Sequence, residues 1–262
     1  MKHIISLMLL STTLTLASEN IEKNSHFSEY LSKAVKSVED ARKDTLKTLN
    51  HVISSVESAR EKNPNIKEST STQIIETKSL ATIARNTADV EIAKAHAMAE
   101  ISKAVDALDA ATPETKKAVE ASSYAAIVNA IASVEIAKAK ASKNIAKATG
   151  KVEISKTIPK EIPHPKETLT IAKNLSAVEI AKSVSDVEVA KLNSYMEIVK
   201  SSLANMRPTL SSENKKKLED IKAQASAKIS SYIAKLEVIK ADIATKIAEE
   251  MSKVKIAESS LK

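Results

Sequence analysis

The segment Val90-Glu91-Ile92-Ala93-Lys94 occurs three times in the chain, because the same five residues stand again at 134–138 and at 178–182. Consecutive copies are therefore 44 residues apart. Within each copy the theme returns nine residues further on, as from Ile92 to Ile101. A fixed period of this size is typical of an array of similar structural units rather than of a fold built around one unique site.

The nine-residue spacing indicates a helix with two apolar sides. Nine residues make about 2.5 turns of an α-helix, so consecutive copies of the theme face opposite sides, and a helix of this kind needs a neighbour on each side. Each segment also places glutamate and lysine three positions apart, where an ion pair contributes about 0.2 to 0.5 kcal/mol to the helix. These pairs are Glu91 with Lys94, Glu135 with Lys138, and Glu179 with Lys182. We favour this structural interpretation over a repeated ligand-contacting surface.

The composition points to the fold class. Gly150 is the single glycine among 262 residues, which removes the tight turns and hairpins that most α/β and all-β folds require. The sequence therefore predicts an all-α fold. We expect an elongated antiparallel bundle, or a coiled-coil-like array, of about five long helices with internal 44-residue repeats.

The first 17 residues have the pattern of a secretory signal. Lys2 is followed by an apolar stretch from Ile4 to Leu16 and by the small-residue pattern Thr15-Leu16-Ala17. The alternative is an uncleaved membrane anchor, but about 13 residues fall short of the roughly 20 needed to span a bilayer. We therefore expect cleavage near Ala17 and an exported chain that is periplasmic or secreted.

Cysteine content and charge exclude several classes of site. The chain has no cysteine, which excludes disulfides, thiolate zinc sites, cysteine nucleophiles and lipid-modified cysteines. The formal net charge is +7. Loss of residues 1–17, which hold Lys2 and no acidic residue, removes one positive charge. The positive excess is mild and spread along the chain.

Prolines and polar runs divide the mature chain into five predicted helices. They cover about 26–62, 73–111, 113–149 and 166–206, and the last runs from Ser211 or Ser212 almost to the C-terminus. Asn63-Pro64-Asn65 ends the first and Arg207-Pro208 ends the fourth. The predicted organisation is a signal peptide at 1–17, a three-helix region at 18–157, a proline-rich linker at 158–165 and a helical hairpin at 166–262.

The third predicted helix has distinct ends and an unusual middle. Thr112-Pro113-Glu114 has the order of an N-cap, a first helical position and an acidic first turn, which predicts a short hairpin turn at 110–112, with a kink in one long helix as the alternative. Gly150 is expected to stop the helix. Between Ala121 and Ala137 the helix is apolar nearly all round, which is typical of a buried helix, and we place it at the centre of the bundle.

No group of residues has the pattern of a reactive site. The mature chain's histidines have no histidine or cysteine partner at metal-ligand spacing; they are His26, His51, His96 and His164. His96 shares a face with Asp89 and Glu100, which would meet a cation from one side only. Carboxylates alternate with lysines as on a solvated surface, and no nucleophile or phosphate-loop motif is present. We therefore predict a non-enzymatic protein with no catalytic, cofactor-binding or metal-binding residues.

The aromatic and basic residues do not suggest nucleic acid as a partner. Tyr124, Tyr195 and Tyr232 have apolar neighbours and are interpreted as core residues. The most basic stretches are Lys215-Lys216-Lys217 and 138–166, but the chain has one phenylalanine and no tryptophan to stack on bases. Anionic envelope polymers or lipid headgroups suit such charge better, and a simple solvated face suits it better still.

These features favour a structural or interaction protein of the bacterial cell envelope that presents long helical surfaces to a protein partner or to a second copy of itself. The alternative is a protein that binds lipid or membrane surfaces through opened amphipathic helices. In its proline-punctuated amphipathic repeats, residues 88 to about 206 resemble exchangeable apolipoproteins, because 44 residues equal two units of 22. That resemblance implies binding to lipid surfaces. The Val-Glu-Ile-Ala-Lys motif is not part of it, and Pro113, Pro159 and Pro208 hold no fixed place in the repeat.

Overall fold

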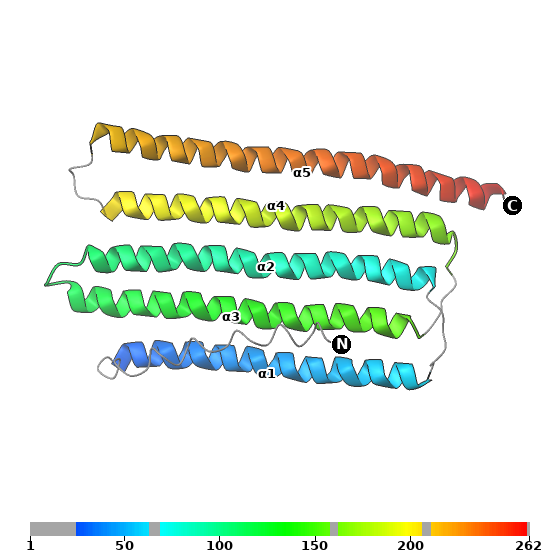
Figure 1. Cartoon of the computed structure of the whole chain (residues 1–262), viewed down its shortest axis with the longest axis horizontal. Helices are drawn as coiled ribbons and strands as arrows, with labels where there is room; N and C mark the ends of the chain where they lie inside the picture. The colour runs from blue at the N-terminus through cyan, green and yellow to red at the C-terminus, as the bar shows by residue number, and fades with distance from the viewer. Residues whose placement is uncertain (1–24, 63–68, 158–161, 206–210, 261–262) are drawn as a thin grey trace.

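Five long helices account for nearly all of the structure. In the computed structural model of the chain, the described residues are 25–62, 69–157, 162–205 and 211–260. The helices are α1 (Ser25–Lys62), α2 (Thr70–Asp109), α3 (Lys116–Ser155), α4 (Pro165–Asn205) and α5 (Ser212–Ser260) (Figure 1). Each has between 38 and 49 residues. The elongated all-α array of five long helices predicted from the sequence is therefore confirmed.

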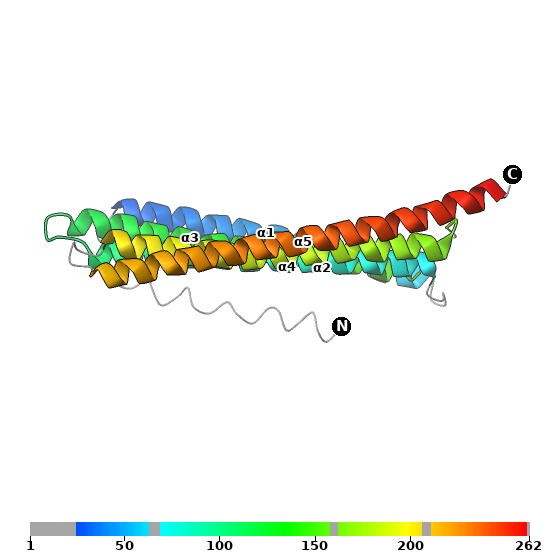
Figure 2. The same cartoon turned by 90° about the horizontal axis from the view of Figure 1, so that it is seen from above.

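The helices lie side by side in one layer, in the order α1, α3, α2, α4, α5 (Figure 1). Among the described residues, α1 packs only on α3 and α5 packs only on α4, whereas α2 packs on both α3 and α4. The view from above shows the five helices overlapping in a narrow, twisted band (Figure 2). The layer is therefore one helix thick and has two broad faces.

Neighbouring helices are antiparallel only where they follow each other in the chain. The pairs α2–α3 and α4–α5 form antiparallel hairpins, whereas α1 runs parallel to α3 and α2 runs parallel to α4 (Figure 1). The side-chain contacts agree with this, since Arg42 with Glu135 and Arg60 with Glu153 both join residues 93 positions apart. Lys103 of α2 likewise pairs with Glu197 of α4.

Small side chains fill the interfaces between helices. Among the described residues, most of the buried apolar side chains are alanines, and six buried serines accompany them. The Thr45 hydroxyl of α1 donates a hydrogen bond to the Ala139 carbonyl of α3 at 2.9 Å, and the Ser79 hydroxyl of α2 donates to the Ala148 carbonyl at 3.1 Å. A hydroxyl that reaches the backbone of the next helix requires closely spaced axes. The helices therefore associate through close backbone approach rather than through large interlocking side chains.

The chain reverses direction between α2 and α3, which confirms the predicted hairpin and excludes the kink. The predicted cap at Thr112 and Pro113 is wrong, because α3 begins three residues later, at Lys116. Thr112 instead belongs to the turn, where its N–H donates to the Thr115 hydroxyl at 3.0 Å and its carbonyl accepts from the Thr115 N–H. The last helix begins as predicted, with the Ser211 hydroxyl accepting from the Asn214 N–H at 3.3 Å.

The prediction that Gly150 ends the third helix is wrong. Gly150 lies inside α3 and is buried. A Cβ atom at this position would lie 2.5 Å from the Val52 Cγ1 of α1. The glycine therefore serves close packing between two helices rather than helix termination.

The prediction that the third helix occupies the centre is also wrong. The central position belongs to α2, because α3 lies between α1 and α2. Between Ala121 and Ala137 the buried residues of α3 are alanines and Ser123, whereas Ile131 is 40% exposed. The layer leaves each inner helix two open sides, so a helix that is apolar all round still exposes large side chains.

Several predictions fall on residues outside the described ranges. They are the signal peptide at 1–17, the helix break at Asn63-Pro64-Asn65 and the break at Arg207-Pro208. The linker at 158–165 is described only from residue 162. The division into regions 18–157 and 166–262 remains a prediction. None of the described helices is long and apolar enough to cross a membrane.

Candidate interaction surface

Three of the histidines lie far apart in the described structure. His51 and His96 are exposed on α1 and α2, and His164 precedes α4 with a φ of 50°. The side chain of His26 lies outside the described set. Within the described ranges, no three histidine or acidic side chains are grouped so that they could hold a metal ion.

Two ion pairs distinguish the two faces of the layer. Arg42 of α1 contacts Glu135 of α3 at 3.2 Å, and Asp44 of α1 contacts Lys143 of α3 at 2.5 Å. Residues two positions apart on a helix point in nearly opposite directions. The Arg42 pair and the Asp44 pair therefore bridge the same two helices from opposite faces.

The face that carries the Asp44 pair continues across α2 and α4 as a charged face. On this side a shallow groove of about 380 Å³ lies between α3 and α2, and Lys140 and Asp89 are among its lining residues. Lys103, about four turns from Asp89, contacts Glu197 of α4 at 3.6 Å. The residues that share this side of α2 are Lys78, Arg85, Asp89, His96, Glu100 and Lys103. We call this side of the layer the charged face.

The opposite side of α2 carries large apolar residues. Leu80 and Met98 are each nine residues from Asp89, and nine residues are about 2.5 turns, so both point away from the charged face. Val105 stands in the same relation to His96. All three apolar side chains are exposed, Met98 most strongly at 64%.

The same side of α4 is apolar as well. Val184 and Tyr195 are each nine residues from a residue of the charged face, Asn193 and Asp186 respectively. Both are exposed. Ile180, one turn before Val184, is also exposed. Leu175 is the exception on this helix, because it lies eleven residues from Asp186 and so on the charged face.

On α3 the apolar side chains share the face of the Arg42 pair. Glu135, which accepts from Arg42, also pairs with Lys138 at 2.7 Å. Tyr124 and Ile131 precede Lys138 by fourteen and seven residues, which places all three on one stripe of the helix. Tyr124 is 46% exposed.

On α1 the exposed apolar residues lie on the stripe of the two arginines. Val35 is two turns before Arg42, Leu46 is one turn after it, and Ile53 is two turns before Arg60. Four helices therefore contribute to one continuous side of the layer, which we call the apolar face. Its exposed large residues are Val35, Leu46, Ile53, Leu80, Met98, Val105, Tyr124, Ile131, Ile180, Val184 and Tyr195.

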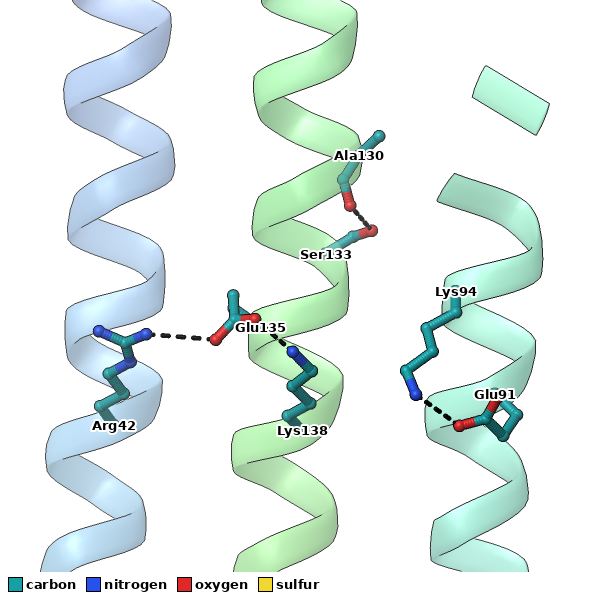
Figure 3. Close-up of polar contacts among 7 residues, drawn as sticks. All are labelled: Arg42, Glu91, Lys94, Ala130, Ser133, Glu135 and Lys138. Atoms are coloured by element: carbon teal, nitrogen blue, oxygen red, sulfur yellow. Dashed lines mark hydrogen bonds and ion pairs between the residues drawn. The ribbon is translucent and has the colours of Figure 1, made fainter. Parts of the chain in front are cut away.

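Several charges on the apolar face are paired within the chain. Figure 3 shows Glu135 between Arg42 of α1 and Lys138 of α3, and Lys94 beside Glu91 on α2. The same arrangement recurs eighteen residues further on, which is twice the nine-residue spacing, where Glu153 pairs with Arg60 and Lys156. Glu188 pairs with Lys191 on α4 at 2.9 Å. The predicted glutamate–lysine pairs are confirmed in the first two copies of the five-residue segment.

The ion pairs also fix the ionisation of the two shared glutamates. Burial alone would raise the pKa of Glu135, but hydrogen bonds and charges from Lys138 and Arg42 together hold the pKa below its ordinary value. Burial also acts to raise the pKa of Glu153, but hydrogen bonds and charges from Arg60 and Lys156 hold this pKa below its ordinary value. Both carboxylates are therefore charged at neutral pH.

The apolar face was not predicted from the sequence. Leu80 is one of the most exposed large apolar residues of α2. Tyr124 and Tyr195 were interpreted as core residues and are about half exposed, whereas Tyr232 is partly buried. The spacing of residues in the sequence does indicate this face. Leu80, Asp89 and Met98 follow each other at nine residues, or about 2.5 turns, so the two apolar residues point to the side of the helix opposite the charged one.

No protein-family model, curated protein or solved structure shows a significant match to this chain.

Proposed function

We propose that this chain is a non-enzymatic structural or interaction protein of the bacterial cell envelope, and that it binds a partner through the apolar face. The observation that carries the proposal is the exposure of eleven large apolar residues on one side of a layer that is charged on the other. Exposed apolar surface that is continuous over several elements is the usual mark of a binding site.

The shape of the layer supports this role. Helices of about 40 residues extend for roughly 60 Å at 1.5 Å per residue, so four of them present a long and flat surface. Such a surface suits another extended protein better than a small molecule, which needs a concave pocket. The groove on the charged face is small by comparison, at about 380 Å³.

Site-specific photocrosslinking in the native host tests the proposal. A photoreactive residue in place of Met98 should form crosslinks to another macromolecule. The matched control is Leu175, which is 50% exposed but lies on the charged face, and it should form few or none. Equal crosslinking from both positions would contradict the assignment of function to the apolar face.

The envelope location is part of the same proposal and has its own test. The pattern of Lys2, the apolar stretch and Ala17 supports export with cleavage near Ala17. Mass spectrometry of the protein from the envelope fraction should find a new N-terminus close to residue 18. Recovery of an intact Met1 from that fraction would contradict cleavage.

Binding to a lipid surface is the second candidate function, and one observation favours it. Tyr124 and Tyr195 of the apolar face have amphipathic rings that suit the boundary between water and lipid. Vesicle flotation at about 0.05 and 0.5 M salt, with Debye lengths of roughly 14 and 4 Å, separates the two functions. Strong flotation at both salt concentrations would favour the lipid-binding function. Binding that disappears at high salt would reflect only the mild positive charge.

A further inference from the structure

None of the described helices covers the apolar face. Domains are usually built from at least two layers of secondary structure that bury apolar surface between them, and the described helices of this chain form one. Within the described ranges the interfaces between helices bury mainly alanine and serine, and the largest side chain with almost no exposure is that of Thr72. Most of the large apolar side chains that would form the core of a two-layer domain are at least partly exposed.

We propose that the partner of the apolar face is a second copy of this chain, stacked face to face so that the two layers form a two-layer sandwich. The inference rests on the proposed function and names its partner. A pair related by a twofold axis would bring the same surface of both copies together, as in most homodimers.

The area of the face is sufficient for a stable dimer. Four helices about 60 Å long and roughly 8 to 10 Å apart cover on the order of 2,000 Å² per copy. A standard protein interface needs about 800 Å² per partner. Even half of this surface would therefore meet the requirement.

The charges of the face fit a second copy better than an anionic lipid surface. Each of Glu91, Glu135, Glu153 and Glu188 already pairs with a lysine on its own helix, and Glu135 and Glu153 also pair with an arginine of α1. These ten groups carry six positive and four negative charges, so most of the charge on each face is offset within its own chain. Lipid-binding helices instead combine a basic surface with tryptophan or phenylalanine, and the chain has no tryptophan and one phenylalanine.

The test uses the purified full chain and two exposed-site variants. Size-exclusion chromatography with light scattering should give twice 28.2 kDa for the unmodified chain. Met98→Glu combined with Ile131→Glu should give the single mass with unchanged helicity by circular dichroism, because both side chains are exposed in one layer. The matched control Leu175→Glu should keep the double mass.

Three results would overturn the inference: a single mass for the unmodified chain at every concentration, a double mass for the Met98→Glu/Ile131→Glu variant, or dissociation by Leu175→Glu alone. If the double variant loses helicity, cysteine labelling decides, because the chain has no cysteine of its own. A cysteine introduced as Met98→Cys should become protected from maleimide as protein concentration rises, whereas Leu175→Cys should stay reactive. Equal reactivity of both at all concentrations would also overturn the inference.

The same measurements separate this inference from the proposed function. If the chain is monomeric but Met98 crosslinks to a different protein in the envelope, the self-association is wrong and the interaction function stands. If the chain is monomeric and floats with vesicles at high salt, both the self-association and the preference for a protein partner are wrong.

Discussion

Gly150 of α3 lies against Val52 of α1 so closely that any side chain on the glycine would overlap the valine. A Cβ atom at residue 150 would lie 2.5 Å from the Val52 Cγ1 and 3.7 Å from the Val52 Cβ. Glycine inside a helix destabilises it by about 0.5 to 1 kcal/mol relative to alanine. The close packing of the two parallel helices, which the glycine permits, offsets this loss of helix stability.

Gly150→Ala is expected to lower the free energy of unfolding by about 1 kcal/mol, because overlap with the stiff, β-branched valine outweighs the gain in helix propensity. In a Val52→Ala background the same substitution should become neutral or stabilising. Urea denaturation of the four chains of this double-mutant cycle gives the coupling. Additive effects of the two substitutions would contradict the contact.

The neighbours Ile131 and Ala132 should respond very differently to aspartate. Ala132 is 8% exposed and packs with Ala34 and Val38, so Ala132→Asp buries an unpaired charge and should destabilise by several kcal/mol. Ile131→Asp should cost only about 1 kcal/mol, because Ile131 is on the open apolar face. Thermal melts at low protein concentration, where association contributes little, make the comparison. Equal costs would indicate that the α1–α3 interface is wrongly placed.

The Asn86–Asn144 contact between α2 and α3 should contribute about 1 kcal/mol. The Asn144 side-chain amide donates to the Asn86 Oδ1 at 2.8 Å, and Asn86 is buried. Asn144→Ala removes the donor and leaves a buried acceptor without it, which costs about 1 to 3 kcal/mol before the gain in helix propensity. Asn193→Ala, at an exposed helical position, receives the same gain and is the control. If both variants unfold at the same urea concentration, the amide contact has no net effect.

Acid should weaken the apolar-face ion pairs. The pKa of Glu135 and that of Glu153 are both lowered from 4.5 in the folded chain, so the unfolded chain binds these protons more readily. Their stabilisation is therefore fully present above about pH 4.5 and is lost as the pH falls through the lower folded-state values. Both pairs are partly exposed, so the effect is under about 1 kcal/mol for each.

A combined Glu135→Gln/Glu153→Gln variant checks this pH dependence. The variant should be less stable than the unmodified chain at neutral pH, and the difference should shrink at about pH 3. Glu57→Gln gives the effect of removing an exposed carboxylate elsewhere on α1. A difference that stays constant between the two pH values would contradict the assignment.

Helix number, length and two-sidedness were predictable because they depend on local pattern. Prolines and capping residues set the predicted boundaries near residues 62, 165 and 212, where helices end or begin. The nine-residue period predicted neighbours on two sides, and α2 has them in α3 and α4. These properties follow from periodicity and turn chemistry alone.

The errors arose where tertiary packing decides. Glycine commonly ends a helix, but the role of Gly150 is to pack against Val52, which is 98 residues away in the sequence. Ile131 lies in a run that is apolar all round, and its exposure follows from the absence of a second layer over α3. The sequence holds no direct signal for the order α1, α3, α2, α4, α5, so the apolar face was not predicted.

The order of the helices in the layer also determines when α1 can pack during synthesis of the chain. In the described structure α1 packs on α3 alone, and its hydrogen-bonded and ionic partners there lie 93 to 99 residues later in the chain. A ribosome adds roughly 5 to 20 residues per second, so α1 waits on the order of 5 to 20 seconds for the residues it must contact. The hairpin of α2 and α3 joins consecutive helices of the chain and needs no residue of α1. The first helix to be synthesised therefore docks on a hairpin made after it.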